Sequence, residues 1–308
     1  MVRGSNNGNR TIDSERNQRT AEKGRWKLLA VLVVGLLVGA VAGYFLPRLS
    51  SPLGSGTAGS GPTVRDFFIV AKQQTVTIAD GVTFSAWTYN GTVPGPVIRV
   101  KEGDLVRVHF SNEHSVPHTM HFHGIRDAAM DGMVPILQGQ SFTYEFVAKP
   151  GGVWLYHCHV NPVSEHMRMG LYGAFIVDPL EGRPKAKEYT LVMSEWDRNG
   201  DSQPDFHVFN GVANQYVATP LQLRAGELVR VFLANLGFEL HTFHIHANVY
   251  TAWPAGTGAG AYVTDNFALA PGETVMVEFV YESPGTYPFH CHVVPHAEMG
   301  MLGLFEVV

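Results

Sequence analysis

The strongest constraint on the fold of this chain is an internal repeat. Residues 103–123 align without gaps with residues 226–246, and 10 of the 21 positions are identical. Residues 139–160 align in the same way with residues 272–293, where 9 of the 22 positions are identical. Because the two matching stretches occur in the same order in both halves, the pattern indicates one duplicated domain.

The composition and patterning of the repeats predict two β-domains. The 308 residues have room for about two domains, and we expect the first over residues 65–180 and the second over residues 181–308. Apolar and polar residues alternate along each repeat, and glycine and proline turns separate the runs, which is typical of a β-sandwich. The net charge of -5 provides no basic surface, so we expect no nucleic-acid partner.

The segment before the repeats predicts a membrane anchor. Residues 1–26 are polar and carry six lysines and arginines, so they are expected to stay in the cytoplasm. Residues 27–46 include 19 consecutive uncharged residues, close to the roughly 20 that a membrane-spanning helix needs. Residues 47–64 are rich in glycine and serine and are interpreted as a flexible linker. The prediction is a single-pass protein of the cell membrane with extracytoplasmic domains; the alternative is a cleaved signal peptide.

The two cysteines of the chain lie in the same short sequence, His-Cys-His, once in each repeat. On a strand, successive side chains point to opposite faces. Cys158 is therefore expected to face one way and its two neighbouring histidines the other, and the same holds for Cys291. One segment can thus serve two metal sites that are joined by a few covalent bonds.

A cysteine, two histidines and a weak methionine are typical of a blue-copper electron-transfer site. The candidate ligands in the second repeat are His241, Cys291, His296 and Met301. Those in the first repeat are His118, Cys158 and His166, with Leu171 at the axial position. The segments after the two cysteines align so that Leu171 takes the place of Met301, which predicts a three-ligand copper with a raised potential in the first domain. Met167 or Met169 as the axial ligand is the alternative.

Eight further histidines form matched sets in the two repeats. The first repeat supplies His121, His123, His157 and His159, and the second supplies His244, His246, His290 and His292. Eight imidazoles suit about three copper ions. A disulfide would not need histidines beside both cysteines, and the paired cysteines of structural zinc sites are missing from the sequence. His109, His114 and His207 lie outside the pattern and are interpreted as ordinary.

Taken together, these motifs resemble those of the multicopper oxidases. The resemblance rests on HTMHFHG, HCHVNPVSEH, HTFHIHA and HCHVVPHAEM, with YNGTVPGPVIRVKEGD at residues 89–104 and MDGMVPILQGQSFTYEF at residues 130–146. Over roughly residues 65–308 the chain is similar to the two-domain members related to small laccases. This implies an all-β architecture of two tandem cupredoxin domains, which are Greek-key β-sandwiches, after the single N-terminal transmembrane helix. It also implies type 1 copper, here in both domains, and a type 2/type 3 trinuclear cluster.

The same resemblance implies roles for individual residues. His121 and His244 match the type 2 ligands. The positions that match type 3 ligands are His123, His157, His159, His246, His290 and His292. Asp131 resembles the family's carboxylate that helps to deliver protons to the cluster. Val294 stands where larger members often carry an acid.

These observations predict a copper-dependent, laccase-like oxidase. It would couple one-electron oxidation of a phenol-like substrate, a metal ion or a small nitrogen compound to the four-electron reduction of dioxygen to water. Each domain offers its histidines on one side, so contacts that close a ring of chains are expected. The resemblance implies a homotrimer with the cluster between subunits. A copper-containing nitrite reductase is the alternative, and a non-catalytic copper electron-transfer protein is the second alternative.

Overall fold

A computed structural model describes residues 62–308 of the chain. The predicted cytoplasmic tail, the membrane anchor and nearly all of the linker lie outside the described residues. Within residues 62–308, no helix combines the length and the apolar character needed to cross a membrane. Strands dominate this part of the chain, so the all-β prediction is confirmed for it.

The strands fall into two series that follow the repeats. The first series is β1 (Val64–Ala79), β2 (Val82–Tyr89), β3 (Ile98–Lys101), β4 (Leu105–Asn112), β5 (His121–Phe122), β6 (Ser141–Val147), β7 (Gly152–His157) and β8 (Tyr172–Asp178). The second series is β9 (Lys187–Trp196), β10 (Phe206–Phe209), β11 (Thr219–Leu223), β12 (Val229–Asn235), β13 (His241–Ile245), β14 (Tyr250–Pro254), β15 (Tyr262–Thr264), β16 (Asn266–Leu269), β17 (Thr274–Phe279), β18 (Gly285–His290) and β19 (Leu302–Val307). Four short helical turns connect them: η1 (Ala128–Met130), α1 (Val163–Arg168), α2 (Gln215–Ala218) and α3 (Val294–Glu298).

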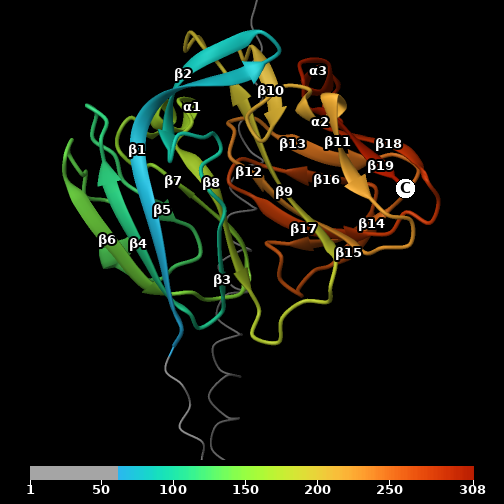
Figure 1. Ribbon diagram of the computed structural model, residues 1–308, viewed down its shortest axis with the longest axis horizontal. Helices are drawn as coiled ribbons and strands as arrows, with labels where there is room; N and C mark the ends of the chain where they lie inside the picture. The colour runs from blue at the N-terminus through green and yellow to red at the C-terminus, as the bar shows by residue number, and fades with distance from the viewer. Residues whose placement is uncertain (1–61) are drawn as a thin grey trace, which may run out of the picture. The chain divides into compact units, whose positions relative to one another are not determined.

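Each series forms two facing sheets, drawn mainly in green for the first and in orange to red for the second (Figure 1). The first domain pairs its strands in the orders β2-β1-β4-β6 and β3-β8-β7-β5. The second uses β10-β9-β12-β17-β14-β15 and β11-β19-β18-β13-β16. The two arrangements correspond strand by strand, including a parallel pairing of β1 with β4 and of β9 with β12. The second domain adds the strands β14 to β16, where the first domain has loops around η1.

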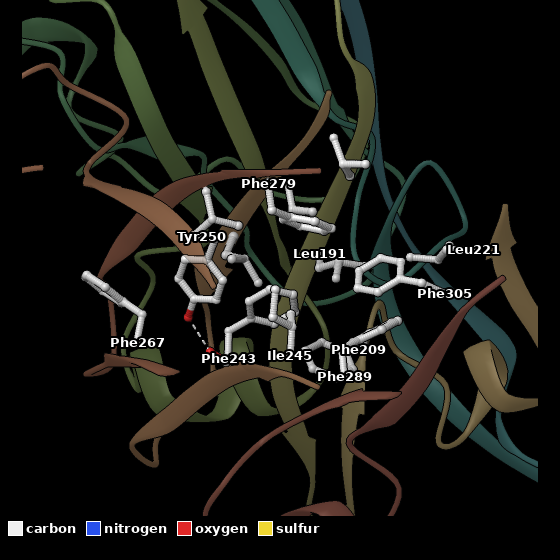
Figure 2. Close-up of a cluster of buried hydrophobic side chains, with 14 of the residues drawn as sticks. Leu191, Phe209, Leu221, Phe243, Ile245, Tyr250, Phe267, Phe279, Phe289 and Phe305 are labelled. Carbon is white, nitrogen blue, oxygen red and sulfur yellow. Dashed lines mark hydrogen bonds between the residues drawn. The ribbon is translucent and has the colours of Figure 1, made fainter. Parts of the chain in front are cut away.

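A hydrophobic core fills the space between the two sheets of each domain. Along β4, buried residues alternate with partly exposed ones, as expected when one face of a strand meets a core. In the second domain, Phe243, Phe289 and Phe305 are buried members of this core (Figure 2). Cys158 and Cys291 are buried members of the first and second cores respectively, so both thiols lie on the inner side of their domain.

A second apolar layer joins the two domains. Nearly every residue of β8 and β12 is buried, because each strand has a core on one face and the other domain on the opposite face. Leu155 and Tyr172 from the first domain pack with Val192 and Leu236 from the second. This packing fixes the two domains relative to each other.

Candidate metal centres

In the second domain, three predicted ligands converge. His241 begins β13, Cys291 follows β18 directly, and His296 lies on α3. The Nδ1 atoms of the two histidines are 3.1 Å apart. The Cys291 sulfur lies 3.9 Å from Nδ1 of His241 and 3.6 Å from Nδ1 of His296. Met301 is fully buried, and its carbonyl accepts a 3.1 Å hydrogen bond from the backbone N–H of Cys291.

The first domain repeats this arrangement. Nδ1 of His118 and Nδ1 of His166, on α1, are 3.1 Å apart. The Cys158 sulfur lies 3.9 Å from the first of these atoms and 3.2 Å from the second. Leu171 is fully buried, and its carbonyl accepts a 3.0 Å hydrogen bond from the N–H of Cys158. Leu171 therefore occupies the same backbone position as Met301 in the second domain.

Both three-atom groups fit copper by the chemistry of their donors. Cys158 and Cys291 are free and buried, so neither is used in a disulfide. Two imidazole nitrogens and one thiolate around a single point are the donor set of a blue-copper site. Of the alternative axial residues, Met167 packs against the apolar layer between the domains.

The two sets of four histidines are each assembled within their own domain. In the first, Nε2 of His123 lies 3.2 Å from Nε2 of His157. In the second, Nε2 of His246 lies 3.0 Å from Nε2 of His290. The other two rings of each set lie beside each other, with centroids 5.1 Å apart for His121 and His159 and 5.2 Å apart for His244 and His292. In the part of the chain that the structure describes, the donors of the two sets form separate groups.

Backbone carbonyls orient the rings in both sets. Nδ1–H of His157 donates to the carbonyl of Cys158, and Nδ1–H of His290 donates to that of Cys291, both at 2.9 Å. Because the protonated Nδ1 is engaged, Nε2 carries the free lone pair and is the atom available to a metal. The neutral form is also favoured by burial, which lowers the pKa of His157 to about 4.

Each histidine set has an aspartate at the same place. Nδ1 of His121 lies 2.9 Å from the carbonyl of Asp131 and 3.1 Å from its carboxylate. Nδ1 of His244 lies 2.8 Å from the carbonyl of Asp265 and 3.8 Å from its carboxylate. Asp131 was predicted from the sequence, whereas Asp265 was not. Asp265 lies between β15 and β16, in the part of the second domain that departs most from the repeat.

Residues that no motif marks contact the outer nitrogens of the cysteine-centred sites. In the first domain, Nδ1 of His114 lies 2.8 Å from Nε2 of His118, and the Trp87 ring packs against both. From the sequence, His114 was interpreted as an ordinary histidine outside the ligand pattern. Its position four residues before His118 could have indicated a contact between the two.

The second domain has acidic residues in this place. Nε2–H of His241 donates to the Glu195 carboxylate at 2.6 Å. Nε2 of His296 lies 3.0 Å from the Glu239 carboxylate, and the His207 ring stacks on His296 with centroids 3.9 Å apart. Because Glu195 is 46 residues before its partner, no local pattern could have identified it.

Before metal binds, these surroundings favour an uncharged histidine and cysteine in the first domain and a charged pair in the second. Burial lowers the pKa of His118 to about 3 and raises the pKa of the Cys158 thiol. Burial by itself would also lower the pKa of His241. The contacts of His241 with Cys291 and Glu195 outweigh this effect and raise its pKa to about 9. The pKa of Cys291 is lowered, because hydrogen bonds from His241 and the Thr242 N–H outweigh burial.

Comparison with known proteins agrees with the geometry. Two family models, both described as multicopper oxidase, match residues 70–182 and residues 183–308. A solved multicopper oxidase is similar in structure, with a TM-score of 0.79 and 41% identity over 82% of this chain and 92% of that one.

Curated relatives carry two different activities in their names. A copper-containing nitrite reductase of Neisseria meningitidis serogroup B is 34% identical over 76% of this chain. Laccase-9 of Arabidopsis thaliana is 29% identical over 67% of this chain. The chain spans 66% of the length of the first relative and 40% of the second.

Proposed function

Because this chain belongs to the multicopper oxidase family across residues 70–308, we propose that it is an oxidase that passes single electrons from a small donor to dioxygen, which is reduced to water. One observation carries the proposal. In each domain, the cysteine of a blue-copper donor set is flanked in sequence by two histidines that belong to a second, separate set. In each domain, one short segment would therefore link an electron-accepting copper site to a site that holds several metal ions.

The residues that would hold copper divide into two kinds of site. His118, Cys158 and His166 would hold a type 1 copper in the first domain, and His241, Cys291, His296 and Met301 would hold one in the second. The two sets of four histidines would share a type 2/type 3 cluster. Copper bound in these sites supplies one-electron redox chemistry and, at the cluster, the capacity to reduce dioxygen.

The protein's own groups prepare these sites. Backbone carbonyls fix the tautomers of His157 and His290, so that the rings need no reorientation when they bind metal. Reduction of dioxygen to two waters consumes four protons along with four electrons. Asp131 and Asp265 hold carboxylates beside His121 and His244, and we assign to them the transfer of these protons.

The proposed cluster requires a second copy of the chain. The donors of the two histidine sets form separate groups in the described residues, so neither set alone offers ligands for three metals. A heterologous contact between the first domain of one chain and the second domain of the next would join them, and such contacts close into rings. We therefore infer a homotrimer, anchored to the cell membrane by residues 27–46 with its domains outside the cytoplasm.

A copper-containing nitrite reductase is the competing function, and the name of the Neisseria meningitidis relative supports it. A reductase with one type 1 and one type 2 copper has no use for paired histidines in both domains. The oxidase predicts about five copper ions per chain, whereas the reductase predicts about two. A purely electron-transferring protein, the other candidate, would leave all eight cluster histidines without a role.

Four measurements on the copper-loaded full-length chain test these functions: copper content, oxygen uptake, nitrite consumption and molecular mass. Metal analysis counts the copper ions per chain, and a dissolved-oxygen electrode follows oxygen uptake with a phenol or a small dye as donor. The oxidase is supported by about five coppers together with donor-dependent oxygen uptake. About two coppers, with nitrite consumption and no oxygen uptake, would establish the reductase. A monomeric mass with full copper and full activity would refute the shared cluster.

A further inference from the structure

The two cysteine-centred sites share equivalent backbone hydrogen bonds but have different partners on their ligands. The N–H of Trp87 donates to the carbonyl of Met169, and the N–H of His207 donates to the carbonyl of Met299. These contacts show that the two sites are built on the same frame. Any difference between the metals they hold therefore originates in the side chains around them.

In the first domain, the ligand His118 has a neutral partner. When Nδ1 of His118 faces the metal, its Nε2–H donates to Nδ1 of His114 at 2.8 Å. His114 then accepts this bond through a lone pair and carries its own proton on Nε2, so it is uncharged. The two rings are buried and parallel within 5°, and the Trp87 ring lies against them and against His166. No carboxylate takes part in these contacts.

In the second domain, the equivalent ligand His241 has an anionic partner. Glu195 accepts hydrogen bonds from Nε2–H of His241 at 2.6 Å and from the backbone N–H groups of Phe238 and Glu239 at 3.0 and 3.2 Å. All three partners donate hydrogen bonds to the Glu195 carboxylate, and none accepts one from it. These contacts favour the ionised form of Glu195. Its side chain is 3% exposed, so solvent does little to screen the charge.

A single residue explains why the carboxylate fits in one domain only. Gly237 aligns with His114 in the repeat. A Cβ atom at position 237 would lie 2.2 Å from one Glu195 carboxylate oxygen and 2.4 Å from the other. The glycine therefore provides the space that Glu195 occupies, whereas His114 fills that space in the first domain. The strand register places Gln73 as the first-domain counterpart of Glu195, because Gln73 pairs with Trp87 and Glu195 pairs with His207.

We propose that this exchange of His114 for a Glu195–Gly237 pair gives the two type 1 coppers of one chain different reduction potentials, the second-domain copper having the lower one. A buried negative charge stabilises Cu(II) more than Cu(I), because Cu(II) carries one more positive charge. Met301 should also lower the potential of the second-domain copper, because an axial donor favours the oxidised ion. Leu171 offers no such donor to the first-domain copper. At equilibrium, electrons then collect on the first-domain copper.

The proposal rests on copper occupying both cysteine-centred sites, as in the proposed function, but not on which acceptor is reduced. The test is a redox titration of the copper-loaded full-length chain without dioxygen, read from the thiolate-to-copper absorption band. Cys158→Ser and Cys291→Ser leave one blue site each, so the two potentials are measured separately. At the same applied potential, we expect the Cu(II)/Cu(I) ratio of the second-domain site to be at least about tenfold higher, which corresponds to about 59 mV.

Three substitutions identify the cause. Glu195→Gln keeps the size of the side chain and removes its charge, and it should lower the Cu(II)/Cu(I) ratio of the second-domain site about tenfold. His114→Glu introduces a carboxylate beside His118 and should shift the first-domain site in the opposite direction. Glu306→Gln is the matched control, because it removes one charge from the same domain at an exposed position that pairs with Gln222.

The outcomes separate this proposal from the proposed function. Equal potentials in the two cysteine variants, or a second-domain site with the higher potential, would overturn the proposal. So would a Glu195→Gln shift no larger than that of Glu306→Gln. If Glu195→Gln fails to bind copper, Glu195→Asp should restore both copper binding and the low potential. Unequal potentials together with no oxygen uptake would leave this proposal standing and reject the oxidase function alone.

Discussion

The two domains differ far more in their surroundings than in their ligands. Both place a cysteine in the core and two histidines on the opposite side of the same segment. In the first domain the histidine set is largely covered, and burial lowers the pKa of His123 and of His157 to about 4. In the second domain His246 and His292 are exposed within the single chain. The two domains therefore share their ligand geometry and differ in the environment around it.

The largest expected effect tests whether both histidine sets serve one centre. His157→Ala and His290→Ala should each reduce oxygen uptake to the level of the copper-free chain, because either change removes a ligand from the shared cluster. The blue absorption of both cysteine-centred sites should persist. His109→Ala is the control, since His109 is bonded to Asp66 and Thr143 outside both sets. Unchanged oxygen uptake in either of the first two variants would contradict the cluster assignment.

The next effect compares the two cores. Phe175 and Phe305 occupy equivalent positions on β8 and β19 and are both almost fully buried. Phe175→Ala and Phe305→Ala should each lower the free energy of unfolding by about 3–5 kcal/mol, from lost burial and the cavity that remains. Phe305 contacts Phe289 at a centroid distance of 4.5 Å, and Phe289 lies two residues before Cys291. The loss of the Phe305 ring should therefore also weaken the blue band of the second site.

Chemical denaturation, followed by tryptophan fluorescence and by the blue band, checks this prediction. The control is Phe68→Ala, because Phe68 is 71% exposed and its replacement should change stability by no more than about 0.5 kcal/mol. Phe305→Ala could instead reduce the blue band of the first-domain site as strongly as that of the second-domain site. In that case the two domains unfold as one unit and cannot be compared as separate folding units.

Sequence patterns predicted the parts of this molecule that depend on local spacing. Period-two alternation predicted two β-domains, and the His-Cys-His segment implied that Cys158 and its neighbouring histidines face opposite sides. The structure places them in this way, with the thiol in the core and His157 against His123. Such features follow from the pleat of a single strand, so they can be derived without knowledge of the tertiary fold.

Apart from Asp131, the residues that surround the ligands depend on tertiary packing and were not predicted. Glu195 reaches His241 only because β9 lies beside β12 and Gly237 leaves a space between them. Asp265 reaches His244 through the added strands of the second domain, for which the first repeat has no template. The apolar layer between the domains was also not predicted, because a strand buried on both faces lacks the alternation that marks a strand buried on one face.

The cysteines provide a test of whether the two type 1 sites contribute equally. Cys158→Ser and Cys291→Ser should each remove one copper and about half of the blue absorption, because each eliminates one thiolate ligand. We expect Cys291→Ser to reduce oxygen uptake more. The second-domain copper has the lower proposed potential, and it therefore transfers electrons onward with the greater driving force. Copper analysis and the oxygen electrode check this expectation; equal losses would indicate that the two sites feed the cluster equivalently.

The smallest expected effect concerns the axial positions. Leu171→Met should raise the Cu(II)/Cu(I) ratio of the first site at a given potential, and Met301→Leu should lower that of the second, each by about tenfold or about 59 mV. Both side chains are fully buried behind the same backbone hydrogen bond, so the exchange changes the donor with little change in position. The double variant Leu171→Met/Met301→Leu exchanges the axial residues of the two sites and leaves the outer partners of the histidine ligands unchanged. It therefore separates the two contributions to the potential. If the order of the two potentials reverses, the axial residue dominates. If it persists, the outer partners set the difference, with Glu195 and Glu239 in the second domain against His114 in the first.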